Sequence, residues 1–240
     1  RYICIFYDFM ELISLRCNLN KYEVIFLRIP KHIGVIPDGN RRWALDNGLK
    51  KENGYKSGLD PGLKLFKLCE NEGISEITYY GFTVDNTKRP KVQRLAFTKA
   101  CIEAVKMLSK ENASLLVVGN TNSSMFPKEL IPYTIRRQSF GNGGIKVNFL
   151  VNYGWQWDLK NYLIEVDNKN NPLDLIYSRD ISRVDLIIRW GGRRRLSGFL
   201  PLQSVYSDFY IIDDYWPDFK PEHFYNALDW YNKQDITLGG

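Results

Sequence analysis

The sequence has few of the side chains that build zinc sites or disulfide frameworks. Its 240 residues include only two histidines, His32 and His223, and four cysteines that are scattered without Cys-x-x-Cys spacing. Structural zinc sites and disulfide frameworks show closely or regularly spaced Cys and His residues. The composition therefore argues against both, and reduced thiols in a cytoplasmic protein are the expectation.

Long apolar runs, internal repeats and low-complexity tracts are also missing. A membrane-spanning helix needs about 20 consecutive apolar residues, and no stretch approaches that length. Residues 1–29 are rich in aromatic and aliphatic side chains, but Asp8 and Glu11 interrupt the run, which argues against a signal peptide. This segment is predicted to be helical and to pack on the domain, on a partner or against a membrane surface.

The sequence does have enough apolar content for one large domain, and it has an excess of positive charge. Hydrophobic residues make up 44% of the chain, no composition shift marks a boundary, and the formal net charge is +6. A single domain over residues 30–240 is therefore expected. The charge favours an anionic partner: a nucleic acid, a membrane surface or a phosphorylated small molecule.

The stretch from His32 to Ala44 predicts a strand, a turn and the start of a helix. An apolar run over residues 33–36 breaks at Pro37, and a helix-favouring segment begins near Asn40. A helix start presents unpaired backbone N–H groups and the positive end of the helix dipole, which together suit a phosphate. The junction is thus a candidate anion site.

The side chains at this junction fit a phosphate and a metal ion. Gly39 lets the backbone come close to a ligand, and Arg41 or Arg42 can add charge-assisted hydrogen bonds. An acid such as Asp38 belongs in a phosphate pocket if it holds Mg²⁺, which binds through one or two carboxylates plus substrate phosphates. The alternative is a solvated loop in which Asp38 caps the helix.

The remaining pattern alternates strands with helices, which predicts an α/β fold with a mainly parallel sheet flanked by helices. Residues 83–90 follow a strand and bring hydroxyl, amide and arginine groups to the same sheet edge as Asp38. Strands are expected over residues 33–36, 77–82, 115–118, 145–151 and 184–190, the last of them being the final strand. Helices are expected from Asn40 and over residues 63–69, 91–110, 128–138 and 155–166.

A second candidate anion site follows the final predicted strand. Four arginines surround Gly191 and Gly192, and Ser197 adds a hydroxyl. Such a density of guanidinium groups is costly unless an anion lies among them, and the alternative is a solvated basic loop. Although 14% of residues are aromatic, no basic helix or stripe suggests nucleic-acid binding, so the anion is expected to be small.

These stretches resemble the motifs of the cis-prenyltransferase family, whose bacterial type is undecaprenyl diphosphate synthase. The resemblance runs from about Pro30 to Phe219. It rests on five motifs in order: His-x4-Pro-Asp-Gly-Asn-Arg-Arg-Trp-Ala from His32, Phe82-Thr83-x-Asp85-Asn86-x-x-Arg89-Pro90, Asn152-Tyr153-Gly154, Asp185-Leu-Ile-Ile-Arg189-x-Gly-Gly-x-x-Arg195-Leu-Ser197 and Trp216-Pro217-Asp218-Phe219.

The resemblance implies a single α/β catalytic domain, a homodimer and a Mg²⁺-dependent transferase. Such an enzyme condenses an allylic diphosphate with isopentenyl diphosphate. The paired Asp-Asp-x-x-Asp motifs of trans-prenyl synthases are not evident, and Asp213-Asp214-x3-Asp218 is interpreted as a strand end and turn.

Carried over by position, the resemblance also implies roles for individual residues. Asp38 would hold Mg²⁺ on the allylic diphosphate, and Asp208 stands where an acid reaches the metal from the partner subunit. The implied catalytic residues are Asp38, Asn86 and Arg89. The implied substrate-binding residues are Gly39, Asn40, Arg42, Lys51, Thr83, Arg189, Arg193, Arg195 and Ser197.

Several positions depart from the family pattern. Arg193 replaces an acid of the diphosphate site, and one hypothesis is that it supplies positive charge missing from the C-terminal tail, residues 234–240. Pro37 and the missing acid are similar to features of lavandulyl-type members, which join two dimethylallyl diphosphates into a branched or cyclised product. Leu150 and Val151 stand where long-chain members carry small residues, and this bulk is expected to shorten the hydrophobic tunnel.

The expected activity is therefore the synthesis of a short-chain cis-prenyl diphosphate. An irregular, branched-product synthase or a terpene cyclase is an alternative, and Trp155 and Trp190 would suit carbocation stabilisation there. A non-catalytic partner subunit is a third alternative, against which the retention of Asp38, Asn86 and Arg89 argues. The expected location is cytoplasmic, with peripheral membrane contact as a further possibility.

Overall fold

Seven strands form one sheet in the order β4-β3-β5-β2-β1-β6-β7. The computed structural model describes residues 28–160 and 172–235. The strands are β1 (His32–Ile36), β2 (Glu76–Tyr80), β3 (Ala113–Val118), β4 (Gln138–Phe140), β5 (Ile145–Leu150), β6 (Leu186–Arg189) and β7 (Asp208–Ile211). Neighbouring strands are parallel, except that β4 runs antiparallel to β3. The predicted α/β fold with a mainly parallel sheet is confirmed.

Helices and short helical turns connect the strands. The α-helices are α2 (Asn40–Asp46), α3 (Gly54–Ser57), α4 (Leu59–Asn71), α5 (Lys91–Leu108), α6 (Pro132–Ile135), α7 (Trp155–Asp158) and α9 (Pro221–Asn232). The 3₁₀ turns are η1 (Lys51–Asn53), η2 (Val84–Lys88), η3 (Lys128–Leu130), η4 (Pro172–Leu175) and η5 (Trp216–Asp218). No helix of the described part of the chain is both long and apolar enough to cross a bilayer.

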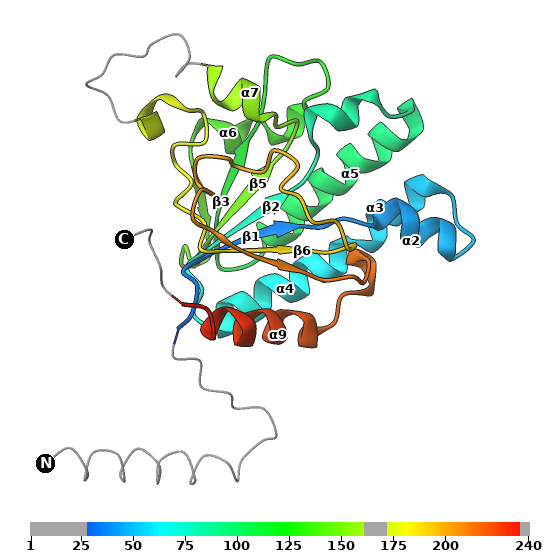
Figure 1. Cartoon of the computed structure of the whole chain (residues 1–240). Coiled ribbons are helices and arrows are strands. Elements are labelled where there is room, and N and C mark those ends of the chain that lie inside the picture. The colour runs from blue at the N-terminus through cyan, green and yellow to red at the C-terminus, as the bar shows by residue number, and fades with distance from the viewer. Residues whose placement is uncertain (1–27, 161–171, 236–240) are drawn as a thin grey trace, which may run out of the picture.

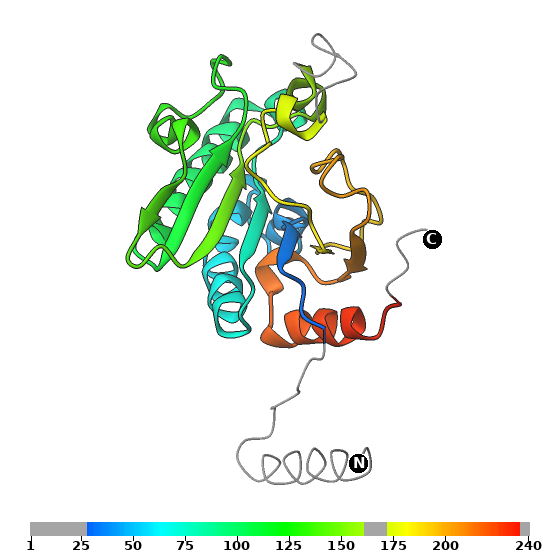
Figure 2. The same cartoon turned by 90° about the vertical axis from the view of Figure 1, so that its left-hand side faces the viewer.

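The sheet buries both of its faces, and successive residues of a strand face opposite sides. On β1, for example, Ile33 and Val35 pack in the larger apolar cluster, whereas Ile36 packs in the smaller one. The larger cluster lies under α4, α5 and α9. Figures 1 and 2 show these helices together on one face, with α7 and the irregular segment leading to β7 on the other. Burial on both faces explains why the central strands read as nearly continuous apolar runs.

His32, one of the two histidines, belongs to a buried polar network within the sheet. Its Nε2 lies 2.8 Å from Thr78 Oγ1, and Asn148 Nδ2 donates to both Thr78 Oγ1 and Glu76 Oε1, at 2.9 and 2.7 Å. Burial lowers the pKa of His32, so its neutral form is favoured. The network joins β1, β2 and β5 near their amino ends and is structural.

Two expected elements were wrong. The helix expected over residues 128–138 is broken: α6 ends at Ile135, and Gln138 begins strand β4. Pro132 has no N–H and starts a new helical segment, while Arg136 is extended, which ends that segment after one turn. In addition, the strand expected over residues 184–190 is not the final one, because β7 pairs with β6 at the edge of the sheet.

Other elements have boundaries that differ from the expected ones, or lie partly outside the described residues. Strand β2 covers Glu76–Tyr80 instead of residues 77–82. The helix expected over residues 155–166 begins as α7, but its second half lies outside the described residues. Residues 1–27 of the segment expected to be helical over residues 1–29, and residues 236–240 of the C-terminal tail, lie outside them as well. Asp213 and Asp214 follow β7, as the strand-end interpretation predicted.

Candidate active site

The carboxyl ends of β1, β2 and β6 open into a cleft of about 570 Å³. Loops that follow the parallel strands converge at this edge, where open α/β sheets bind their ligands. Twelve of the predicted site residues line the cleft: Asp38, Gly39, Asn40, Arg42, Lys51, Thr83, Asn86, Arg89, Arg189, Arg193, Arg195 and Ser197. Segments as far apart as residues 38 and 197 therefore meet in one site.

Asp38 is the best-connected side chain of the cleft. Arg189 donates to Asp38 Oδ2 at 2.7 Å, the Gly39 N–H donates to Asp38 Oδ1 at 2.6 Å, and Arg42 lies 3.5 Å from the same oxygen. Burial raises the pKa of Asp38, but the hydrogen bond and the charge of Arg189 outweigh it, and the pKa is lowered overall. Asp38 is therefore a carboxylate held in a fixed orientation, with a third of its side chain still exposed.

Arg189 acts as a buried clamp between the two halves of the cleft. Its side chain is 4% exposed, and besides Asp38 it contacts the Arg195 carbonyl and donates to Ser197 Oγ at 2.9 Å. Strand β6 places this guanidinium beside the end of β1, because Ile36 and Arg189 are register partners. Arg189 thus fixes Asp38 relative to the arginine-rich loop.

Two glycines let the backbone come close at the end of β1. Gly39 has a φ of 101°, and a Cβ there would stand 2.7 Å from Tyr215 Cδ1. Gly191 has a φ of 81°, and its carbonyl accepts a hydrogen bond from Arg42 at 2.9 Å. Both positions disfavour a side chain because of steric overlap and a positive φ, so the backbone packs closely against Tyr215 and Arg42 there.

The segment after β2 forms a preorganised turn at the rim. The Thr83 N–H donates to Asn86 Oδ1 at 3.1 Å, which caps η2. Arg89 donates to the Tyr55 hydroxyl at 3.0 Å and lies over the Phe97 ring, 5.6 Å from its centroid. Burial lowers the pKa of Arg89 and raises the pKa of Tyr55, so the Tyr55 hydroxyl keeps its proton near neutrality.

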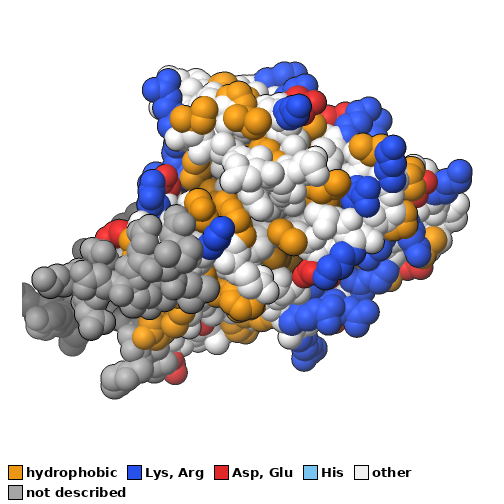
Figure 3. Space-filling model, turned by 90° about the horizontal axis from the view of Figure 1, so that it is seen from above, with side chains coloured by type: hydrophobic (Ala, Val, Ile, Leu, Met, Phe, Trp, Pro, Cys, Tyr) orange, Lys and Arg blue, Asp and Glu red, His pale blue; other side chains and the backbone are white. Residues whose placement is uncertain are grey.

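The cleft is strongly electropositive. Among the described residues, seven cationic side chains line it against two carboxylates: Arg41, Arg42, Lys51, Arg89, Arg189, Arg193 and Arg195 against Asp38 and Asp85. In Figure 3 most of the Lys and Arg side chains gather on the right of the view, the side where Figure 1 places α2 and α3. Such a concentration of positive charge suits a ligand with several negative charges.

Asp208 does not lie with Asp38. It begins β7 and pairs in register with Leu186, so it stands at the amino end of the strands, whereas Asp38 follows their carboxyl ends. There it lies 3.5 Å from Arg28. Within one chain the structure therefore does not bring the two predicted metal ligands together, and the implied contribution of Asp208 from a partner subunit stays a prediction.

The residues present fit Mg²⁺ that is held jointly with a substrate. No cluster of three or more His, Cys, Asp or Glu that could hold a metal occurs in the described ranges. Asp38 is one fixed carboxylate facing a polyanion-binding cleft, and Mg²⁺ commonly takes one or two carboxylates plus phosphate oxygens. Two buried atoms of cleft residues, Asn40 Oδ1 and Arg189 Nε, have no hydrogen-bond partner within residues 28–160 and 172–235, as expected where a polar ligand completes the site.

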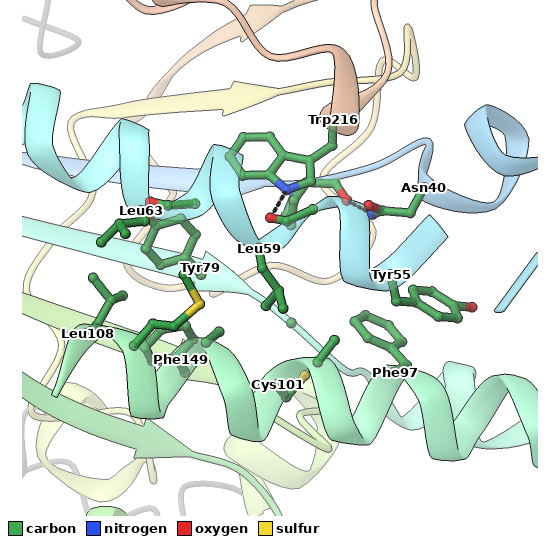
Figure 4. A pocket seen from close by; sticks show the side chains of 17 residues that line it. Asn40, Tyr55, Leu59, Leu63, Tyr79, Phe97, Cys101, Leu108, Phe149 and Trp216 are labelled. Carbon is green, nitrogen blue, oxygen red and sulfur yellow. Dashed lines mark hydrogen bonds between the residues drawn. The ribbon is translucent and has the colours of Figure 1, made fainter. Parts of the chain in front are cut away.

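An apolar cavity of about 90 Å³ opens from the same cleft. The two share Pro37, Asn40, Tyr55, Gly81 and Phe97 as lining residues. Figure 4 shows the cavity between α4 and α5, with Leu59 and Leu63 on one side and Cys101 and Leu108 on another. Burial raises the pKa of Cys101 to about 12, so its thiol is a neutral part of the wall. The site therefore combines a polyanion pocket with an adjoining apolar pocket.

Two expectations about bulky residues are corrected. Leu150 and Val151 do not line the apolar cavity; their neighbour Phe149 does, together with Tyr79 and Met107. Trp155 is 44% exposed and Trp190 is fully buried, and neither reaches the cleft or the cavity. Trp216 does line the cavity, whereas Trp43 donates to Asp218 Oδ1 at 2.7 Å. The proposed support for a cyclase from Trp155 and Trp190 is therefore lost.

Sequence reasoning missed the aromatic rim. Tyr55 and Phe97 stack with ring centroids 4.6 Å apart at the junction of cleft and cavity, and Tyr80 donates to the Ser197 carbonyl at 2.8 Å. Tyr55 and Phe97 come from α3 and α5, which meet only through tertiary packing. Periodicity marks Phe97 only as a helix-face residue, so no local signal identifies it.

Comparisons with known proteins agree with this geometry. Residues 36–239 match the family model described as "Putative undecaprenyl diphosphate synthase". The chain is 34% identical over 229 residues to the ditrans,polycis-undecaprenyl-diphosphate synthase, (2E,6E)-farnesyl-diphosphate specific, of Buchnera aphidicola subsp. Schizaphis graminum, covering 88% of this chain and 91% of that protein. It is 31% identical over 238 residues to an isoprenyl transferase of Clostridium tetani, covering 92% and 93%.

A solved structure shares the fold. Lavandulyl diphosphate synthase from Lavandula x intermedia, in complex with dimethylallyl diphosphate, superposes with a TM-score of 0.76 at 20% sequence identity. The match covers 88% of this chain and 98% of that one. At this identity the likeness supports the fold alone.

Proposed function

The chain belongs to the undecaprenyl diphosphate synthase family of prenyltransferases, and from this we propose that it condenses an allylic diphosphate with isopentenyl diphosphate into a short-chain cis-prenyl diphosphate. The observation that carries the proposal is the junction of an electropositive cleft with a small apolar cavity. The cleft suits two diphosphates, and the cavity suits the hydrocarbon part of one of them. We further propose a homodimer in the cytoplasm, with peripheral membrane contact.

The allylic diphosphate is proposed to bind between β1 and α2. Gly39 and Asn40 give backbone access there, and Arg42 and Lys51 contribute positive charge at the edge of the cleft. Asp38 would hold Mg²⁺, which when bound supplies positive charge to the diphosphate leaving group. Arg189 keeps the Asp38 carboxylate ionised and oriented before substrate arrives.

Isopentenyl diphosphate is proposed to bind at the arginine-rich loop. Arg193, Arg195 and Ser197 line that side of the cleft, and the Arg189 clamp sets the position of the loop. Cleavage of the allylic C–O bond leaves charge on a diphosphate, which preorganised guanidinium groups stabilise more strongly than water does. Arg89 is proposed to close the cleft from the β2 side, and Asn86 caps the turn that leads to it.

The apolar cavity is proposed to hold the growing chain and to keep water from the allylic cation. Its wall of Leu, Phe, Tyr and Trp side chains offers no charged group among the described residues. A cavity of about 90 Å³ favours a short product over a long polyprenyl chain. The proposed product is therefore short, and the bulky side chains that limit its length are those of Phe149, Tyr79 and Met107.

A branched-product synthase of the lavandulyl type is the second candidate. Pro37 and Arg193 favour it in the sequence, and the chain has the same fold as a lavandulyl diphosphate synthase. The two candidates differ in their second substrate.

The assay that separates the two candidates supplies dimethylallyl diphosphate and Mg²⁺ with or without isopentenyl diphosphate, and identifies products by mass spectrometry before and after phosphatase treatment. Chain extension requires isopentenyl diphosphate and adds five carbons per step. A ten-carbon diphosphate made from dimethylallyl diphosphate alone would assign the protein to the branched-product class. A hydrocarbon released without phosphatase would indicate a cyclase.

A further inference from the structure

Trp190 is a buried side chain next to the diphosphate site that the chemistry above does not use. It follows the clamp residue Arg189, is 0% exposed, and packs edge-on against Trp216. The ring centroids are 4.7 Å apart, and the ring planes meet at 79°. A residue with no solvent contact and no cleft contact can influence the site only through what it touches.

The neighbour that it touches, Trp216, is part of the wall of the apolar cavity. Trp216 Nε1 donates to the Gly58 carbonyl at 2.8 Å, at the start of α4, and Figure 4 shows the indole beside the cavity near Leu59 and Asn40. A Cβ on Gly58 would stand 2.8 Å from Trp216 Cδ1, so the indole lies close to the start of α4. This close approach and the hydrogen bond to the Gly58 carbonyl hold Trp216 at α4, and Trp190 packs edge-on against the same indole.

Trp190 is itself held in place by α9. Its Nε1–H points at His223 Nδ1 at 3.3 Å, and the Lys220 backbone N–H points at the same atom at 3.3 Å. Two donors at Nδ1 place the ring proton on Nε2, which lies 2.9 Å from Asp214 Oδ2 and donates to it. The hydrogen bond fixes the orientation of the Trp190 ring in addition to its packing.

We propose that Trp190 is a positioning residue that sets how large a hydrocarbon chain the apolar cavity accepts, by holding Trp216 in the cavity wall. The inference rests on the proposed function only in taking this cavity as the prenyl site. Replacing Trp190 by a small residue opens space behind Trp216, so the indole moves back and the cavity enlarges. A phenyl ring in place of the indole keeps most of the support.

A binding experiment tests this without turnover. Affinities of n-alkyl phosphates from five to fifteen carbons are measured by calorimetry for the wild type, Trp190→Ala and Trp190→Phe. Affinity rises about fourfold for each methylene that enters an apolar site and stops rising when the cavity is full. Trp190→Ala is expected to move this plateau to chains several carbons longer, whereas Trp190→Phe leaves it near the wild-type length.

Phe224→Ala is the matched control, because it removes a fully buried aromatic ring from α9 that does not line the cavity. Its plateau should not move even if its Tm falls as far as that of Trp190→Ala. If Trp190→Ala does not fold, Trp190→Leu takes its place, and Trp216→Ala enlarges the cavity directly. An unchanged plateau in a folded Trp190→Ala or Trp190→Leu protein, with a longer one in Trp216→Ala, overturns the inference.

Product analysis separates this inference from the proposed function. If the wild type elongates prenyl diphosphates, Trp190→Ala should release products at least one five-carbon unit longer. A shifted plateau in a protein that joins no prenyl units would sustain the role of Trp190 and refute the proposed function. Normal elongation by the wild type, with neither the affinity plateau nor the product length shifted in Trp190→Ala, would sustain the proposed function and refute the role of Trp190.

Discussion

At the scale of single residues, Asp38 carries the largest share of the proposed chemistry. Asp38→Asn keeps the shape of the side chain but removes the negative charge that faces the cleft and pairs with Arg189. We expect prenyl transfer to fall by at least about 100-fold, because charge stabilisation in a preorganised site is typically worth that much. Steady-state rates with labelled isopentenyl diphosphate measure the loss.

Asp60→Asn is the control for this change. Asp60 pairs with Lys64 on the exposed side of α4, where the ion pair is solvated. The rate of prenyl transfer by Asp60→Asn should stay within about twofold of the wild-type rate. Equal losses in both variants would mean that charge at Asp38 has no special role.

The lowered pKa of Asp38 predicts a pH dependence of stability. A carboxyl whose folded pKa lies below its unfolded value of about 3.9 stabilises the protein above that value. The contribution is lost as the pH falls through the folded pKa. Since a third of the side chain is exposed, we expect only about 1 kcal/mol.

Urea unfolding of the wild type and Asp38→Asn from pH 7 to pH 3 measures this contribution. The difference in the free energy of unfolding should be constant near neutrality and shrink below about pH 4. A difference that grows toward acid pH would show that burial, and not the Arg189 pair, dominates the Asp38 pKa.

Arg193 and Arg194 offer a comparison of adjacent arginines. Arg193 lines the cleft, whereas Arg194 is exposed and is not among the residues that line it. Arg193→Glu should raise the KM for isopentenyl diphosphate about tenfold or more, because it reverses a charge beside the bound anion. Arg194→Glu should change it much less. If both variants bind isopentenyl diphosphate as the wild type does, Arg193 does not supply the charge assigned to it.

At the scale of elements, the turn between β1 and α2 depends on a backbone that only glycine adopts readily. Gly39→Ala places a Cβ 2.7 Å from Tyr215 Cδ1 at a φ of 101°. We expect a loss of about 2–4 kcal/mol in the free energy of unfolding, together with weaker substrate binding, because Asp38 shifts with the turn.

Gly48→Ala separates strain from steric overlap. Gly48 also has a positive φ, 70°, but nothing lies within 4 Å of its added Cβ. Gly48→Ala should lower the free energy of unfolding by only about 1–2 kcal/mol and leave the activity unchanged. Chemical denaturation and kinetics of the two variants give the comparison, and equal losses would remove the argument from steric overlap.

Sequence reasoning found the buried central strands because a strand covered on both faces is apolar throughout. It failed for β4 and β7, which lie at the two edges of the sheet. The residues of β7 are all half-buried, and β4 has only three residues. Neither strand therefore has an apolar pattern that distinguishes it from the sequence around it. Tertiary pairing, not local preference, defines these strands.

Sequence reasoning grouped the residues that line the cleft better than it found the edges of the sheet, because the cleft residues directly follow strands and cluster in short motifs. What the sequence could not show is which residues share a wall. Tyr55 stacks on Phe97 and Trp216 packs on Trp190, and in each case packing between elements creates the contact. The cavity size depends on such contacts, which explains why Leu150 and Val151 were the wrong residues to choose.

At the scale of the whole molecule, one edge of a parallel sheet brings together a polyanion cleft and an apolar cavity. The sheet order places β6 and β2 on either side of β1, so the arginine-rich loop and the η2 turn flank Asp38. Because the chain belongs to the family and has this geometry, we propose that it joins two prenyl diphosphates.

The most direct test is the incorporation of carbon-13-labelled isopentenyl diphosphate into products. The full chain is incubated with the labelled compound, dimethylallyl or geranyl diphosphate and Mg²⁺, with EDTA in a parallel sample. We predict a diphosphate product that is five labelled carbons longer, absent with EDTA and absent in Asp38→Asn. A folded wild type that binds both diphosphates yet forms no labelled carbon–carbon bond would contradict the account.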